Sequence, residues 1–378
     1  RNSRNCSGLR WRDWLFSRSA KCGAARQLGP DSSTRIPTSI SSLPPKEGLV
    51  PKTSTILFGI AAAAAGWYFF QKYDLRGLEG VQLAPEGQST AQPNAPNDPF
   101  APPPVRSTGT IRVASFNIQV FGKSKAAKPH VMDLLARIVR SFDLVAIQQI
   151  QCSNDDLLPN FVELINAADR HYDYVVGPRL GRTSTKEQYA YIFDLTTIEV
   201  DRSQLYTVAD PDDLLHREPL VGWFRVRGPS PDQAFTFSLV NIHTDPDETD
   251  QELNVLDDVY RVVRDDGRRE DDVIILGDLN VDDKNLGELG QISGMTWVIS
   301  GTPTNTRGTS QYDNLVFQRQ ATSEFTGRAG IFDYMRQYNL SMEEALEVSD
   351  HLPVWAEFSA YEGGQPGRIA ARPDAGPR

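Results

Sequence analysis

Apolar and polar positions alternate in two ways along the chain, and the pattern predicts one folded domain over residues 110–360. Short apolar runs that end in polar residues are typical of strands, whereas apolar residues recurring every three or four positions are typical of helices. Strands are predicted at 111–117, 144–147, 172–176, 189–193, 220–226, 235–242, 273–276, 314–317 and 353–358, and helices at 131–142, 157–167 and 253–263. Many strands with few intervening helices favour an α/β fold in which two packed sheets are flanked by helices.

The pattern before the domain is different. Residues 1–54 are rich in Arg and Ser and lack sustained apolar periodicity, which indicates a disordered or targeting segment. The apolar run at 55–71 predicts a membrane anchor, and the basic residues before it would keep the N-terminus cytoplasmic and export the domain to the periplasm or the cell exterior. A buried Ala-rich helix is the alternative for this run, and an organelle membrane is the alternative destination.

Two further segments have the composition of spacers. Residues 72–109 form a Pro-rich linker, with seven prolines between Pro85 and Pro104, and such a composition favours an extended, semi-rigid chain. Residues 361–378 are rich in Gly, Pro, Ala and Arg and are predicted to be a disordered tail. The linker would hold the domain away from the predicted membrane anchor.

Charge narrows the partners that the domain can attract by itself. The net charge of −10 divides into +7 for residues 1–52 and −17 for the rest of the chain. An acidic domain gains no long-range attraction from a polyanion, so binding of nucleic acid requires a divalent cation or a local basic patch. Of Cys6, Cys22 and Cys152, only Cys152 lies in the predicted domain, so no disulfide can form within it.

Polar residues gather where the predicted strands begin or end, which is where a sheet can hold them rigidly. The five places are Ser115-Phe116-Asn117, Gln148-Gln149, Asn241-Ile242-His243, Gly277-Asp278-Leu279-Asn280 and Ser349-Asp350-His351. Each one alone is more often a turn former or a helix cap. Their joint occurrence in this order is what indicates a functional site.

In this order the five places resemble the signatures of the endonuclease/exonuclease/phosphatase superfamily. The likeness is greatest to its deoxyribonuclease I branch, through SFNIQVFG at 115–122, GPRLGRTSTKEQYAYIF at 177–193, HREPLV at 216–221 and TPTNTRGTSQYDNLVF at 302–317. The resemblance spans nearly all of 111–358. It implies a four-layer α/β sandwich, in which two packed, mainly antiparallel sheets are flanked by helices.

The resemblance also implies two pairs of a histidine and a carboxylate. His351, oriented by Asp313, would activate a water molecule, and His243, oriented by Glu187, would protonate the leaving oxygen; the two labels could be reversed. A carboxylate behind an imidazole fixes its tautomer and stabilises its protonated form. Hydrolysis of a phosphodiester needs both a base for the water and an acid for the leaving group.

The resemblance also implies which residues lie at the metal and at the phosphate. The resemblance places Asp278 and Asn280 at the scissile phosphate and the metal, with Asn117, Gln149 and Asp350 as further metal positions. Oxygen ligands of this kind suit Mg²⁺, with Mn²⁺ or Ca²⁺ as alternatives. The positions that resemble contacts to DNA backbone phosphates are Arg182, Arg217, Thr304 and Tyr312.

Two positions depart from the family pattern. Gln149 stands where the family has the glutamate that is its principal metal ligand, and a neutral amide brings no negative charge to a cation. Thr185 stands where deoxyribonuclease I has a tyrosine that packs into the DNA minor groove, which weakens the case for duplex DNA. The first departure predicts weakened metal binding.

The sequence therefore predicts a metal-dependent phosphodiesterase, in the first place a membrane-tethered endonuclease that hydrolyses DNA. Its partners would be DNA or another phosphodiester, and a membrane through residues 55–71. One alternative is a phosphatase or phospholipid phosphodiesterase of the same superfamily, which an anchor and an acidic surface would suit. A second alternative is a catalytically weak module that binds phosphodiesters, motivated by Gln149.

Overall fold

The computed structural model describes residue 100 and residues 109–364. The predicted leader at 1–54, the predicted anchor at 55–71, nearly all of the linker at 72–109 and residues 365–378 of the tail lie outside the described residues, so these predictions stay predictions. Within the described residues, no helix has the length and apolar character needed to cross a bilayer. Regular structure continues slightly past the predicted boundary at 360, because Tyr361 bridges to Ala234 and the 3-10 turn η4 (Glu362–Gly364) follows.

The first sheet has six strands in the order β12-β13-β1-β2-β4-β3. Their bounds are β1 (Thr110–Phe121), β2 (Leu144–Ile150), β3 (Tyr172–Val176), β4 (Gln188–Asp194), β12 (Phe325–Ile331) and β13 (Val354–Ser359). Only the central pair β1 and β2 is parallel, and all other neighbours are antiparallel.

The second sheet has seven strands, six of them in the order β10-β11-β9-β8-β7-β5, with β6 also paired to β7. Their bounds are β5 (Ile198–Val200), β6 (Tyr206–Thr207), β7 (Leu220–Val226), β8 (Thr236–His243), β9 (Val273–Asp278), β10 (Met295–Trp297) and β11 (Asp313–Gln318). Again one central pair, β8 and β9, is parallel and the rest are antiparallel. The prediction of mainly antiparallel sheets is confirmed.

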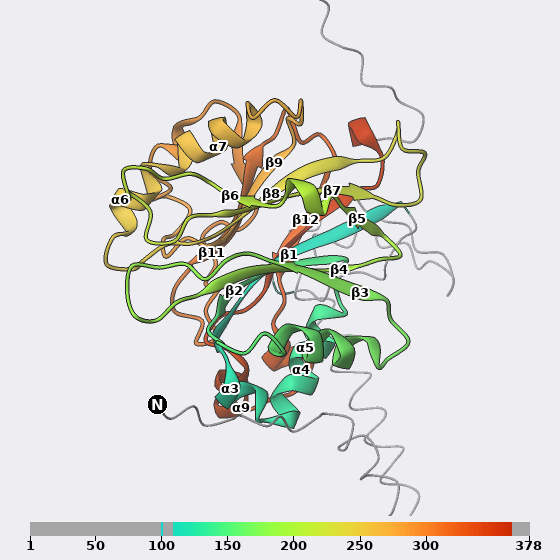
Figure 1. The fold of residues 1–378 in the computed structure, drawn as a ribbon, viewed down its shortest axis with the longest axis vertical. Coiled ribbons are helices and arrows are strands. Elements are labelled where there is room, and N and C mark those ends of the chain that lie inside the picture. Colours follow the sequence, from blue (N-terminus) through green and yellow to red (C-terminus); the bar gives the residue numbers. More distant parts are fainter. Residues whose placement is uncertain (1–99, 101–108, 365–378) are drawn as a thin grey trace, which may run out of the picture. The chain divides into compact units, whose positions relative to one another are not determined.

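The two sheets pack face to face, with β1 and β2 of one against β8 and β9 of the other (Figure 1). Buried aromatic rings fill part of the space between them. The Phe235 ring stacks on Phe237 and Phe358, at centroid distances of 4.8 and 5.8 Å. Close packing of such large apolar side chains gives the sandwich a rigid centre, on which the strand ends can hold polar groups in place.

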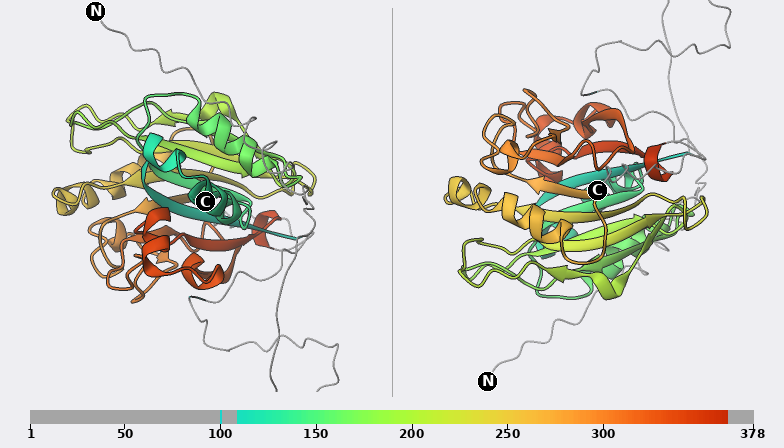
Figure 2. Two further views of the ribbon diagram at one scale, coloured as in Figure 1. Left: turned by 90° about the horizontal axis from the view of Figure 1, so that it is seen from below. Right: turned by 90° about the horizontal axis from the view of Figure 1, so that it is seen from above.

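Helices cover the outer faces of both sheets, so the predicted four-layer sandwich is confirmed. Figure 1 shows α3, α4, α5 and α9 together outside the first sheet, and α6 and α7 outside the second; Figure 2 presents the two helical layers in turn. The helix bounds are α3 (Lys123–Ala126), α4 (Pro129–Val139), α5 (Leu157–Asn166), α6 (Thr249–Leu253), α7 (Leu256–Arg264), α8 (Tyr334–Gln337) and α9 (Met342–Val348), and the remaining 3-10 turns are η2 (Arg202–Gln204) and η3 (Leu289–Gln291).

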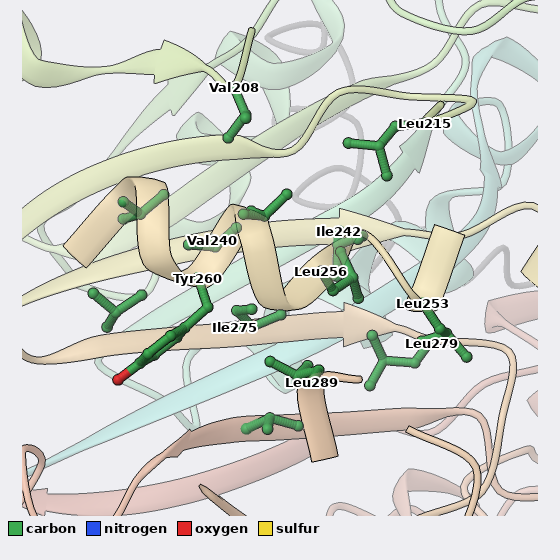
Figure 3. Packing of buried hydrophobic residues seen from close by; sticks show 14 of the residues in the cluster. Val208, Leu215, Val240, Ile242, Leu253, Leu256, Tyr260, Ile275, Leu279 and Leu289 are labelled. Carbon is green, nitrogen blue, oxygen red and sulfur yellow. The ribbon is translucent and has the colours of Figure 1, made fainter. Parts of the chain in front are cut away.

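The prediction of one continuous helix over 253–263 is wrong, because the chain forms two helices with Asn254 and Val255 between them. Leu253 from α6 and Leu256 from α7 both enter the apolar cluster on the outer face of the second sheet. Figure 3 shows α7 lying on this face, with Tyr260 against the strands. Apolar spacing reveals which face is buried, and that face is shared by both helices, so the spacing does not reveal the break.

The other predicted helices and strands are confirmed, with ends that shift by a few residues. The main extensions are at strand ends that carry polar residues, such as β1, which continues through Phe121, and β2, which continues through Ile150. Apolar patterning did not predict β5, β6, β10, β12, α3, α8 and α9, which are short or partly exposed. Such elements have few apolar positions from which periodicity can be read.

Two adjacent valines on α7 test this packing, because Val263 is fully buried and Val262 is 55% exposed. The change Val263→Ala removes two buried methyl groups and should lower the free energy of unfolding by about 2 kcal/mol. The matched change Val262→Ala should alter it by less than about 0.5 kcal/mol. Equilibrium unfolding in denaturant measures both, and equal losses would contradict the packing of α7 against the second sheet.

Candidate active site

Two parallel strand pairs carry the candidate residues to one edge of the sandwich. At the end of the first pair, Asn117 lies opposite Gln148, and at the end of the second, His243 lies opposite Asp278. Antiparallel β11 begins at this same edge, where Asp313 pairs with Asp278. The strand directions thus explain why residues far apart in sequence meet here.

The Asp278 carboxylate lies at the centre of the group. Its Oδ2 accepts a hydrogen bond from Asn117 Nδ2 at 2.8 Å and lies 3.5 Å from Nε2 of both His243 and His351. Asp278 is only 1% exposed. Both imidazoles therefore direct the same ring nitrogen towards one buried oxygen atom.

A glycine next to Asp278 allows the strands to approach closely enough for this arrangement. Gly277 has a φ of +155°, and a Cβ at this position would lie 1.9 Å from the carbonyl oxygen of Ile242 on β8. No side chain fits at that distance from a backbone atom. The Gly-Asp sequence is thus required by the packing of β8 against β9 as well as by the site.

Glu187 holds His243 from behind. His243 Nδ1 lies 3.0 Å from Glu187 Oε2, and the other carboxylate oxygen accepts from Gln151 Nε2 at 3.2 Å and lies 3.5 Å from Arg217 Nη1. Burial raises the pKa of Glu187, but the hydrogen bond and charge of His243, with Arg217, outweigh it and lower the pKa below its ordinary value. Glu187 is therefore ionised beside the imidazole.

Asp313 holds His351 in the same way. His351 Nδ1 lies 2.9 Å from Asp313 Oδ2, and the Thr304 hydroxyl donates to that oxygen at 2.7 Å. Burial lowers the pKa of His351, but the surrounding carboxylates, Asp313 first among them, outweigh burial and raise the pKa to about 10. The two predicted pairs of a histidine and a carboxylate are thus present at hydrogen-bond distance.

The acidic residues of the site fit a divalent cation. Ligand atoms of Asp278, Asp313 and His351 all lie within 4.8 Å of one another. Asp313 Oδ1 and Asp350 Oδ1 are buried and have no hydrogen-bond partner. In the described part of the chain, no Lys or Arg nitrogen lies within 4.0 Å of the carboxylate oxygens of Asp278, Asp313 or Asp350. Hard oxygen ligands that no Lys or Arg neutralises suit Mg²⁺, Mn²⁺ or Ca²⁺.

Gln149 and Asn280 lie at the rim of this group in left-handed backbone conformations, with φ of 60° and 53°. Gln149 Oε1 accepts from the backbone N–H of Val120 at 2.9 Å, so the amide oxygen already has a partner. The backbone N–H of Asn280 donates to Asp278 Oδ1, and Asn280 Nδ2 donates to the carbonyl oxygen of Thr244 at 2.8 Å. Their predicted roles as ligands of metal or phosphate stay predictions.

The four predicted phosphate contacts differ in their surroundings. Arg217 is buried and donates to the carbonyl oxygens of His243 and Thr244 at 3.1 and 3.3 Å. Thr304 is fully buried and accepts from the backbone N–H groups of Tyr312 and Asp313. Both residues position the histidine and carboxylate pairs, and direct contact with a phosphate stays a prediction for them.

The other two predicted contacts lie nearer the surface. Arg182 pairs with the carboxylates of Asp213 and Glu248, which hold its pKa above the ordinary value against the effect of burial. The Tyr312 ring lies beside the His351 imidazole, with centroids 5.7 Å apart. Any phosphate that binds Arg182 must compete with two acidic partners.

Several supporting residues were not predicted from the sequence. The backbone N–H of His243 donates to Tyr189 Oη at 3.0 Å, and Tyr334 Oη donates to the carbonyl of Ser349 at 2.7 Å. Lys125 Nζ donates to the carbonyls of Ile118 and Val348. These contacts join side chains to distant backbone atoms, and such pairings leave no signature in apolar spacing.

Comparison with known proteins agrees with this geometry. Residues 114–351 match the model of the endonuclease/exonuclease/phosphatase family. The chain is 35% identical over 263 residues to deoxyribonuclease gamma of Rattus norvegicus, covering 65% of this chain and 83% of the relative. It is 34% identical over 262 residues to deoxyribonuclease-1-like 1 of Sus scrofa, covering 66% and 81%.

Among solved structures, an endonuclease/exonuclease/phosphatase family protein from Bacteroides thetaiotaomicron aligns with a TM-score of 0.44 and 16% identity, over 66% of this chain and 97% of that one. The family match covers more than half of the chain and includes all five strand-end motifs. The chain therefore belongs to the endonuclease/exonuclease/phosphatase family.

Proposed function

We propose that the protein is a divalent-metal-dependent endonuclease that hydrolyses phosphodiester bonds of DNA. The observation that carries the proposal is the convergence of His243 Nε2 and His351 Nε2 at 3.5 Å from one oxygen of Asp278, each ring backed by a second carboxylate. The relatives named above are deoxyribonucleases at 34 to 35% identity, which supports DNA as the substrate class.

The two imidazoles divide the proton transfers of hydrolysis. His351, with Nδ1 on Asp313 and a pKa raised to about 10, holds a proton at Nε2 and gives it to the leaving oxygen, and His243, with Nδ1 on Glu187, takes the proton from the attacking water at Nε2, which is the reverse of the labels first expected. A carboxylate at Nδ1 leaves Nε2 as the reactive nitrogen in each case. Arg217 and Thr304 keep the two carboxylates in place.

A divalent cation supplies the positive charge that a phosphodiester needs as it is cleaved. Asp278 and Asp350 would hold it, with Asn117 and Gln149 as neutral oxygen ligands. The carboxylates of this chain otherwise repel a phosphate, and the domain is acidic as a whole. Binding of the cation therefore has to accompany binding of the substrate.

Gln149 is proposed to weaken that cation site. Its Oε1 accepts from Val120 as a carboxylate oxygen would, so the change of side chain preserves the local hydrogen bond and removes a negative charge. Affinity for hard cations depends on the number of charged ligands. Activity is therefore expected to need more metal than an enzyme with glutamate at this position.

The first test is nicking of supercoiled plasmid DNA by the full chain in a Mg²⁺, Mn²⁺ and Ca²⁺ series. Loss of an acid or base group costs about 10² to 10⁴-fold in rate, so His243→Ala and His351→Ala should each fall by that factor. The exposed His171 gives the matched control, and His171→Ala should nick at the wild-type rate. Gel densitometry of the nicked form measures all four rates.

Equal nicking by wild type and His243→Ala would show that the catalytic site lies elsewhere. If DNA stays intact while inositol phosphates or sphingomyelin are hydrolysed, the substrate class is wrong. Both arms use the same protein and metal series, so the result separates a wrong site from a wrong substrate.

The change Gln149→Glu should restore the missing charge. We expect the metal concentration for half-maximal nicking to fall by roughly 10 to 100-fold, the size of effect seen when groups that tune a metal ligand are changed. Gln251→Glu adds the same charge at an exposed position on α6 and should leave the metal dependence unchanged. Identical metal curves for wild type and Gln149→Glu would rule out a weakening effect of Gln149.

The protonation of His351 can be measured directly by NMR in metal-free protein. Because the pKa of His351 is raised from 6.5 to about 10, its ring should stay protonated through pH 8. A raised pKa means that the folded state holds the proton more tightly, so this stabilising effect is full below about pH 6.5 and is lost as the pH rises through 10. The change Asp313→Asn should lower the pKa, and a wild-type His351 that titrates near 6.5 would contradict the electrostatic account.

A further inference from the structure

Three carboxylates lie together at the end of the sandwich opposite the candidate active site. Asp272 directly precedes β9, Glu324 directly precedes β12, and Glu362 lies in η4 after β13. One carboxylate oxygen from each residue lies within 4.8 Å of one oxygen from each of the other two. These three residues are termed the distal carboxylate cluster. Asp272 and Asp278 stand at opposite ends of β9, so about 20 Å of strand separates the cluster from the catalytic group.

Polar atoms in and beside the distal carboxylate cluster lack partners. Asp272 and Glu324 are 1% and 2% exposed, and Asp272 Oδ1 and Glu324 Oε2 accept no hydrogen bond from an N–H or O–H donor. The fully buried hydroxyl of Thr322, which is not part of the acidic group, likewise makes no hydrogen bond. It nevertheless lies close enough to the Asp272 carboxylate to act on its pKa. Buried polar atoms without partners are uncommon, and an ion is one explanation for them.

Positive charge is also missing around the cluster. In the part of the chain that the structure describes, no Lys, Arg or His nitrogen lies within 4.0 Å of the carboxylate oxygens of these three residues. Burial and the neighbouring acids raise the pKa of Asp272 well above its ordinary value and the pKa of Glu362 to about 7. Either protons or a cation must therefore compensate the charge at neutral pH.

The Asp272 and Glu324 side chains lie at hydrogen-bond distance from each other, so a shared proton and a bound cation are the two ways to compensate this pair. Ca²⁺ binds carboxylate and neutral oxygens at about 2.4 Å in a flexible geometry. The cluster offers three carboxylates close enough together to share one ion, and the Thr322 hydroxyl is a neutral oxygen beside them. Mg²⁺ has shorter bonds and stricter geometry, which would require the side chains to draw together. Glu362 is half-buried, so an ion can enter from its side.

The location gives such an ion a mechanical role. Asp272 leads into a strand of the second sheet, whereas Glu324 and Glu362 flank strands of the first sheet. We propose that the distal carboxylate cluster is a Ca²⁺ site that ties the two sheets together at the end remote from catalysis. This site is separate from the proposed nuclease chemistry, because none of its residues contacts the candidate active site.

The test compares the full chain with Glu324→Gln, after removal of metal by EDTA, by equilibrium dialysis against Ca²⁺ and by thermal unfolding. Wild type should bind one more Ca²⁺ per chain than Glu324→Gln. Saturating Ca²⁺ should raise the wild-type Tm by roughly 5 to 10 °C and should raise the Tm of Glu324→Gln much less. In EDTA the order should reverse, with Glu324→Gln the more stable, because one of the repelling charges is gone.

Two controls make the outcome specific. Glu343→Gln removes an exposed carboxylate of α9 and should behave as wild type, whereas Asp278→Asn should keep the distal Ca²⁺ and its effect on Tm. If Glu324→Gln does not fold, Glu362→Gln replaces it in both measurements, because the Glu362 side chain is only half-buried. Equal binding and an equal Tm response in wild type and the cluster variants would overturn the site, and an equal response to Mg²⁺ would overturn the choice of Ca²⁺. Neither readout depends on nuclease activity.

Discussion

The meeting of Asn117 and two histidines at one oxygen of Asp278 is the interaction on which the rest of the site depends. Nε2 of His243 and of His351 lie at the same distance, 3.5 Å, from Asp278 Oδ2, so the two rings are positioned relative to each other through a single atom. That atom is at the end of β9, next to a glycine that admits no side chain. Alignment of the two groups proposed to transfer protons thus follows from strand packing, which costs no reorganisation when a substrate binds.

Burying so many carboxylates at one edge has an electrostatic consequence. Unpaired charges in a protein interior are costly, and they persist where a proton or a cation compensates them. At the edge that carries the candidate active site, the carboxylates differ in how their charge is compensated. Arg217 lies beside Glu187, whereas Asp313 and Asp350 each keep one buried oxygen without a hydrogen-bond partner. The negative charge beside His243 is therefore neutralised by a basic side chain of the protein. The negative charge beside His351 is neutralised only when protons or a cation are present.

Much of this site was accessible from the sequence, because its members stand at the ends of apolar strands. His243, Asp278 and His351 could be placed in this way, and the resemblance supplied Glu187 and Asp313 as the partners of the two histidines. The sequence did not indicate that Arg217 and Thr304 would be buried behind those pairs. Their partners are backbone atoms and carboxylates distant along the chain, and neither apolar spacing nor strand assignment specifies which backbone atom a side chain will meet.

The same limit applies to the distal carboxylate cluster. Asp272, Glu324 and Glu362 each precede or follow a strand in a separate part of the chain, and alone each reads as a solvated loop residue. The pairing of β12 with β13 and the packing of that sheet against the sheet of β9 bring them together, and the packing of two sheets cannot be deduced from the apolar pattern of either one. Helix breaks such as that between α6 and α7 escape prediction for a related reason, since the buried face continues across them.

Gln149 illustrates how a fold can keep the geometry of a site while its charge changes. The residue has a φ of 60°, as Val120 nearby has a φ of 52°, and the hydrogen bond from Val120 N–H to Gln149 Oε1 joins these two left-handed positions. An amide oxygen fills that role as well as a carboxylate oxygen does. The local backbone therefore gives no stability penalty for glutamine over glutamate, and we propose that only the binding of a cation is sensitive to the difference in charge. A substitution that keeps the hydrogen bond and removes the charge can therefore change the proposed metal dependence without loss of the fold.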